Sequence, residues 1–198
     1  MTRLEGRALI DNVGDLLVGK VQQCQPATQQ ALQLAACIGN QFDLWTLAMA
    51  HDKSPREAAT DLWEAVAEGL LVSDRDAYTV MTQDVGSPAE AVTMVYRFVH
   101  DHVQQAVYAA IPDAAKQAVH YRLGHLLWQR TPLAAREEHI FAMVHQLNLG
   151  RGLLAEQTAR DEVATLNRAA GRRASASAAY APAFSFLCTG LELAEAEV

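Results

Sequence analysis

The sequence predicts a mainly α protein that carries one small β-sheet in its first half. Apolar residues recur at three- and four-residue steps over most of the chain, which is the period of an amphipathic helix. Short alternating runs rich in β-branched and aromatic residues stand before Pro112, and everything after it is helical in pattern. We therefore expect two domains, residues 1–111 with helices and strands and residues 112–198 with helices alone.

Four helices are expected in the first domain from their apolar spacing and end signals. They cover residues 9–24, 27–38, 43–51 and 55–69. The second should end at Gly39-Asn40 in a left-handed conformation, and Asp43 can cap the third. The fourth has the strongest start signal, because Ser54, Pro55 and Glu57 form a capping box with proline at the first helical position.

Three short strands are expected after these helices. Leu70 to Ser73 and Tyr78 to Met81 flank a polar turn and are typical of a hairpin. A third strand is predicted at Met94 to Phe98, where apolar side chains alternate with others. Short helices followed by a hairpin and a third strand give the outline of a winged-helix domain.

The second domain is expected to consist of antiparallel helices at residues 113–129, 137–149, 158–175 and 178–194. The inward residues of the last helix should be Phe184, Leu187, Leu191 and Leu193. The last two helices are rich in small residues, as close helix pairs of solenoids are. Since a solenoid needs about three repeats for stability, we expect this array to be the start of a truncated superhelix.

Composition argues against several classes of function. The net charge is −7 and the basic residues do not cluster, so nucleic acid is not expected as a partner. The three cysteines show no ligand spacing and are typical of reduced thiols in a cytoplasmic protein. The N-terminus lacks the apolar core of a signal peptide, and no run is apolar enough to span a membrane. We expect a cytoplasmic protein that does not contact membranes.

Motifs for catalysis are absent from the sequence. It contains neither GxxxxGK[ST] nor GxGxxG, and no serine lies in a GxSxG elbow. The seven histidines form no HExxH arrangement, and neither a structural metal nor an HD-type phosphohydrolase is favoured. They are His51, His100, His102, His120, His125, His139 and His145. We expect no catalytic residue, no metal and no cofactor bound by this chain alone, which is not expected to be an enzyme.

His100 and Asp101 are the candidate site, because the apolar period changes there from that of a strand to that of a helix. Val103, Val107 and Ile111 then mark one helix face. The first amides of a helix lack intrahelical partners and favour an anion. The functional interpretation is that the His100 imidazole donates a hydrogen bond to a nucleotide phosphate held by a neighbouring domain. The negative charge of Asp101 would interact favourably with the helix dipole. The alternative is a histidine that only packs or caps.

Several stretches resemble one family. They read LIDNVGDLLVGKVQ, TQQALQLAACIGNQFDLWTLA, LWEAVAEGLL and YRFVHDHVQQAVYAAIP, and they are similar to the STAND-type (AAA-like) ATPase module of large bacterial signalling proteins. Those proteins join this module to a Ser/Thr kinase domain and often to GAF and histidine kinase domains. VHQLNLGRGLL and AGRRASASAAYAPAFSFLCTGLELA resemble the helical stretch that follows. The resemblance runs from about Leu9 to Leu193.

The resemblance implies a winged-helix domain followed by the first TPR-like helices, both lying after the nucleotide-binding core. Val99-His100-Asp101 also looks like the MHD motif of NB-ARC ATPases, in which the histidine contacts the β-phosphate of ADP; Val99 departs from that pattern. ADP or ATP would then belong to the parent protein, with an upstream nucleotide-binding domain as partner. Protein partners would bind the helical half. The kinase motifs, phosphate loop and Mg²⁺-binding acid are absent here, so no catalysis is implied for this chain.

Our first hypothesis is a non-catalytic regulatory segment of such a signalling protein. A transcriptional regulator is the first alternative, with the helix at 55–70 entering the DNA groove. That helix holds Arg56 but four acidic residues, Glu57, Asp61, Glu64 and Glu68, which repel phosphates. A stand-alone helical scaffold with a peptide groove is the other alternative.

Overall fold

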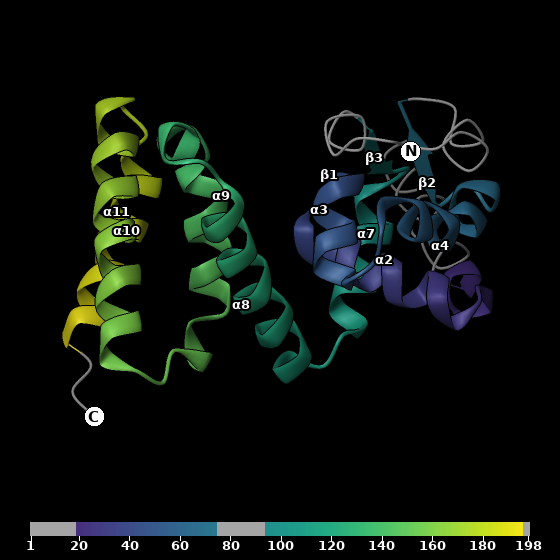
Figure 1. The fold of residues 1–198 in the computed structure, drawn as a ribbon, viewed down its shortest axis with the longest axis horizontal. Helices are drawn as coiled ribbons and strands as arrows, with labels where there is room; N and C mark the ends of the chain where they lie inside the picture. Colours follow the sequence, from purple (N-terminus) through teal and green to yellow (C-terminus); the bar gives the residue numbers. More distant parts are fainter. Residues whose placement is uncertain (1–18, 75–93, 196–198) are drawn as a thin grey trace, which may run out of the picture. The chain divides into compact units, whose positions relative to one another are not determined.

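The computed structural model describes residues 19–74 and 94–195 (Figure 1). The chain divides into two compact units, an N-terminal unit at Met1–Pro112 and a C-terminal unit at Asp113–Val198. Of the helix expected at residues 9–24, only residues 19–23 are described as helical. The strand expected at Tyr78 to Met81 lies outside the described residues.

The N-terminal unit combines helices with a three-stranded antiparallel sheet of order β1-β3-β2. The helices are α2 (Pro26–Ile38), α3 (Leu44–His51), α4 (Pro55–Ala67) and α7 (Asp101–Ala110). The strands are β1 (Gln41–Asp43), β2 (Leu71–Ser73) and β3 (Val95–Phe98). Helices dominate the described chain, which confirms the predicted fold class of a mainly α protein with a small sheet.

The predicted helix starts are confirmed where a side chain carries the signal. Asp43 caps α3, since its Oδ1 accepts a hydrogen bond from the amide of Thr46 at 2.7 Å. At the start of α4 the Ser54 amide donates to Glu57 Oε2 at 2.9 Å, and the Glu57 amide donates to Ser54 Oγ. This is the complete capping box that the sequence predicts.

Two local expectations in this unit are wrong. Gly39 has φ 150° and ψ −175°, so it is not in the left-handed helical conformation expected after α2. Glycine tolerates this backbone, which leads the chain directly into a strand. That strand, β1, was not expected, because three residues are too few to show a period. It pairs with β3, placing Phe42 opposite Tyr96.

The core of the N-terminal unit lies between the sheet and its helices. Phe42 stacks on Tyr96 with ring centroids 5.8 Å apart and contacts Phe98 at 6.2 Å. Phe98 is fully buried, and Val103 and Val107 of α7 join the same cluster. Because β3 pairs on both edges and carries two of these rings, it is the strand that fixes where α7 begins.

The C-terminal unit is helical throughout its described residues. It contains α8 (Asp113–Arg130), α9 (Arg136–Leu149), α10 (Gln157–Ala176) and α11 (Tyr180–Glu195), with 3₁₀ turns η1 (Leu133–Ala135) and η2 (Arg151–Leu153). Sequential helices pack on one another, most closely α10 on α11 (Figure 1). A Cβ added at Gly171 would lie 2.6 Å from Leu187 Cγ, and one at Gly190 would lie 3.2 Å from the carbonyl oxygen of Ala164. Small residues therefore permit the close approach of this pair.

The inward face predicted for α11 is largely wrong. Leu193 is buried, but Phe184 is 71% exposed, Leu191 61% and Leu187 38%. The reason is that α11 turns its small residues, Ala183 and Gly190, toward α10. On α8 a polar residue likewise takes an inward position, since His120 is buried.

Candidate functional site

The strand-to-helix junction at residues 99–100 is held on both sides by backbone hydrogen bonds. The Phe98 amide donates to the carbonyl of Asn40 at 3.0 Å, and the Val99 amide donates to that of Leu70 at 3.1 Å. The junction is therefore tied to the end of α2 and to the chain that enters β2. Its position follows from the sheet rather than from a free loop.

Helix α7 begins immediately after this junction and is anchored along its length. Val103 and Val107 are buried in the core, and Gln104 Nε2 donates to the carbonyl of Ala36 at 2.8 Å. The first residue of the helix, Asp101, is exposed, and its negative charge interacts favourably with the positive end of the helix dipole. The start of α7 is thus a fixed point on the surface of the N-terminal unit.

His100 occupies the N-cap of α7 and is exposed to solvent. Within the described chain its side chain accepts no hydrogen bond from the first turn, and the backbone is extended at φ −136° and ψ 138°. The carbonyl of His100 accepts from the Val103 amide at 3.0 Å. An imidazole so placed is available to donate to an external oxyanion, beside helix amides that also favour one. The structure thus brings His100 and Asp101 together at one accessible helix start.

Metal coordination finds no support in the described residues. Across residues 19–74 and 94–195 no group of three or more histidine, cysteine or acidic side chains could hold an ion. Over the same residues, no helix combines the length and the apolar character needed to cross a membrane.

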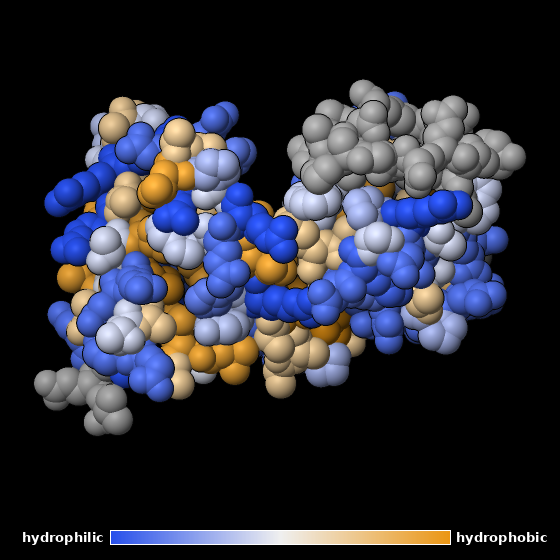
Figure 2. Space-filling model, in the orientation of Figure 1, coloured by the Kyte–Doolittle hydropathy of each residue, from blue (hydrophilic) through white to orange (hydrophobic). Residues whose placement is uncertain are grey.

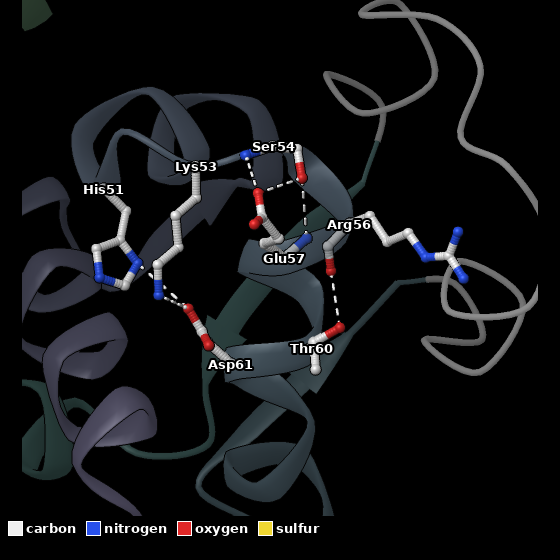
Figure 3. A network of polar contacts seen from close by, with 7 residues as sticks. All are labelled: His51, Lys53, Ser54, Arg56, Glu57, Thr60 and Asp61. Atoms are coloured by element: carbon white, nitrogen blue, oxygen red, sulfur yellow. Dashed lines mark hydrogen bonds and ion pairs between the residues drawn. The ribbon is translucent and has the colours of Figure 1, made fainter.

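The candidate DNA-contacting helix, α4, begins in a polar network of basic, acidic and hydroxyl side chains (Figure 3). Asp61 Oδ2 lies 2.6 Å from Lys53 Nζ and 3.4 Å from His51 Nδ1, so it holds the end of α3 against α4. Figure 3 shows Arg56 directed away from this network, while its carbonyl accepts from Thr60 Oγ1 at 2.9 Å. The network serves to join α3 to α4, and sequence spacing gave no sign of it because its partners come from two helices.

A second polar pair missed by the sequence analysis lies inside the C-terminal unit. His120 Nδ1 of α8 and Gln146 Oε1 of α9 are 2.6 Å apart, and both residues are buried. Because an amide oxygen only accepts, this geometry places the proton on Nδ1. Burial lowers the pKa of His120, and the hydrogen bond to Gln146 offsets only part of that effect. His120 is thus a neutral, structural histidine.

This pair predicts a pH-dependent stability. The pKa of His120 is lower in the folded chain than the ordinary value of about 6.5, so the unfolded chain binds the proton first as the pH falls. The contribution of His120 to stability should therefore be fully present above about pH 6.5 and decrease below it, by up to about 1.4 kcal/mol per pH unit. Urea unfolding between pH 5.5 and 7.5 measures this slope. The control His120→Gln keeps a polar partner for Gln146 but cannot titrate, and an unchanged slope in that variant would contradict the assignment.

Comparison with known proteins gives one distant similarity. The chain is 26% identical over 214 residues to the Hybrid signal transduction histidine kinase G of Dictyostelium discoideum. The alignment covers 90% of this chain but 6% of that protein, so the chain spans a small fraction of its relative's length. No family model matches the chain, and no solved structure matches it. The relative is not bacterial, unlike the proteins of the resemblance noted above, and the chain is similar to a short part of a large signal-transduction protein.

Proposed function

We propose that this chain is a non-catalytic regulatory segment of a STAND-type ATPase signalling protein. The observation that carries the proposal is the exposed His100 at the N-cap of α7, on a junction anchored to the sheet. The distant similarity to a histidine kinase of signal transduction supports a signalling role. The parent protein would join kinase and ATPase domains, act in the cytoplasm, and carry the catalytic residues that this chain lacks.

The order of elements supports the proposal that the N-terminal unit is a winged-helix domain. Helix α2 is followed by β1, two further helices and then β2 and β3, with β3 in the centre of the sheet. Two of the three strands expected from the sequence correspond to β2 and β3, β1 is additional, and the strand expected at Tyr78 to Met81 lies outside the described residues. The TPR-like C-terminal unit would bind protein partners. Nucleic acid would not be a partner, since Glu57 is exposed next to Arg56 at the start of α4 and Glu68 is exposed at its C-cap.

In the proposed mechanism His100 reports the nucleotide state of an upstream domain. ADP bound to that domain would supply the phosphate oxyanion, and the fit rests on the accessible ring and the uncapped first turn of α7. His100 would donate one hydrogen bond to the phosphate, and Asp101 would hold the helix start. A ligand shifts a two-state equilibrium only by its differential affinity for the two states. The hydrogen bond thus stabilises whichever arrangement brings His100 to the phosphate.

The test is His100→Ala in the longer polypeptide that contains this segment. Loss of one hydrogen bond to a charged group costs about 1.5–3 kcal/mol, so ADP should dissociate roughly 10- to 150-fold more readily. His102→Ala is the matched control, because it removes another exposed imidazole two residues further along α7. Equal ADP retention in the wild type and in His100→Ala would refute the switch. A shift in a low-salt gel assay with the 198-residue chain would favour a DNA-binding regulator instead.

A further inference from the structure

A groove lies between α8 and α10 of the C-terminal unit. It has a volume of about 410 Å³, within the range of small-molecule sites, which is about 300–1,000 Å³. Helix α8 contributes His125 and Trp128 to its lining, and α10 contributes Asp161, Glu162 and Leu166. We call this the α8–α10 groove. Its lining mixes apolar and polar side chains, as does the wider surface of the C-terminal unit in Figure 2.

One nitrogen in this lining lacks a hydrogen bond. Nε2 of His125 is buried and has no partner within the part of the chain that the structure describes. The imidazole packs edge-on against Tyr121, with the two ring centroids 4.4 Å apart. A buried polar atom without a partner costs free energy, and a ligand that bonds to it removes that cost. Because His125 lines the groove, a group seated there can supply the missing hydrogen bond.

The charges of the groove select the sign of the ligand. A neutral imidazole can either accept or donate at Nε2, depending on its tautomer. Asp161 and Glu162 are both exposed, and the described residues of the lining include no lysine or arginine. Arg160, on the same helix, instead donates to the carbonyl of Leu154 at 3.1 Å and to Gln157 Oε1 at 2.8 Å. The two carboxylates therefore favour a cation, which would donate to Nε2.

The rest of the lining suits an apolar stem. Trp128 already holds the Arg136 guanidinium 3.7 Å from its ring centroid, so in the groove it acts as an apolar wall. Leu166 and Val163 extend this wall along α10. An arginine side chain joins an aliphatic stem to a cationic head, and its guanidinium is more weakly hydrated than an ammonium group. It therefore loses less hydration than a lysine on entering such a site, and the lining favours an arginine.

We propose that the α8–α10 groove binds an arginine side chain of a partner protein. The stem would lie against Trp128 and Leu166, and the guanidinium would donate to Nε2 of His125 and to the carboxylates of the groove. This rests on the proposed role of the C-terminal unit in binding protein partners, and it adds which side chain is recognised. One side chain buries little surface, so we expect a dissociation constant of about 0.1–1 mM for a short peptide.

An NMR titration of the 198-residue chain with the peptide acetyl-Gly-Ala-Ala-Arg-Ala-Ala-Gly-amide tests this binding. The indole N–H signal of Trp128 should shift and approach saturation by about 5 mM peptide. Trp45 and Trp63 lie in the N-terminal unit and are internal references. The matched peptide carries citrulline, which has the shape of arginine without its charge, and should bind at least about tenfold more weakly. Equal binding of the two peptides, no binding, or shifts of the same size at Trp45 or Trp63 would overturn the proposal.

Two variants assign the binding to the groove. His125→Phe keeps an aromatic ring against Tyr121 but removes the nitrogen, and it should weaken binding of the arginine peptide about tenfold or more. Glu162→Gln removes one charge at an exposed position and should weaken it about two- to fivefold. Glu138→Gln is the matched control and should bind as the wild type does, since Glu138 is exposed on α9 outside the lining. Wild-type affinity of Glu162→Gln, or of a folded His125→Phe chain, overturns the groove as the site.

This result is separate from that of the nucleotide switch. The titration contains no nucleotide, so a negative outcome leaves ADP retention in the longer polypeptide as the test of His100. The C-terminal unit could also bind a protein whose affinity is unchanged by His125→Phe and Glu162→Gln. In that case its role in partner binding stands, and the proposal for the groove is overturned.

Discussion

Replacing Phe98 by alanine is expected to lower the free energy of unfolding of the N-terminal unit by about 3–5 kcal/mol. Phe98 is fully buried, and its ring lies 6.2 Å from that of Phe42. Truncation removes the ring contacts and leaves a cavity that neighbouring strands cannot close. Since β3 is hydrogen-bonded on both edges, the sheet cannot shift without breaking the pairing that positions the start of α7.

Urea unfolding with amide hydrogen exchange measures this effect and assigns it to the N-terminal unit. Exchange is needed because Trp45 and Trp63 lie in that unit while Trp128 lies in the other, so fluorescence reports both. Val72→Ala on the adjacent strand is the control, since Val72 is 41% exposed and should cost less than about 0.5 kcal/mol. Similar losses in the two variants would show that the ring of Phe98 does not support the core.

The helices of this chain could be predicted because residues near their starts form capping hydrogen bonds that are local in sequence. Asp43, Ser54 and Glu57 each satisfy backbone groups within three residues, so their effect does not depend on the rest of the fold. The third strand and the change of period at His100 were likewise visible, because residues 94–98 alternate over enough positions to define a face. The candidate site follows directly from that boundary.

The features that sequence could not supply depend on partners far along the chain. Strand β1 forms because it pairs with the edge of β3, which lies some 50 residues later in the sequence. Its three residues are too few to show a period of their own. The buried pair of His120 and Gln146 joins two helices whose separate patterns suggested only apolar contacts. On α11 the small residues face inward, so the large apolar residues that normally mark a buried face mark the exposed one.

Replacing Gly150 by alanine is expected to destabilise the C-terminal unit by about 3 kcal/mol, the upper part of the range for overpacking. Gly150 ends α9 with φ −92°, a conformation open to other residues, so backbone strain is not the reason. The reason is space: an added Cβ would lie 2.4 Å from the backbone nitrogen and 2.6 Å from the Cα of Tyr121. Backbone atoms in the middle of α8 cannot move aside alone, and therefore α8 and the end of α9 would have to separate.

Gly152→Ala provides a matched control two residues further on, in the 3₁₀ turn η2 that Gly150 precedes. Its added Cβ would lie 2.9 Å from Oε1 of Gln117, the far end of a flexible side chain on the same helix, α8. That side chain can rotate away, and the cost should stay below about 0.5 kcal/mol. Hydrogen exchange of α8 and α9 compares the two variants within one unit. The two changes add the same methyl group two residues apart. A large difference in exchange protection between the variants would therefore show that stability needs the close approach of α8 and α9. Equal protection would mean that this approach is not needed for stability.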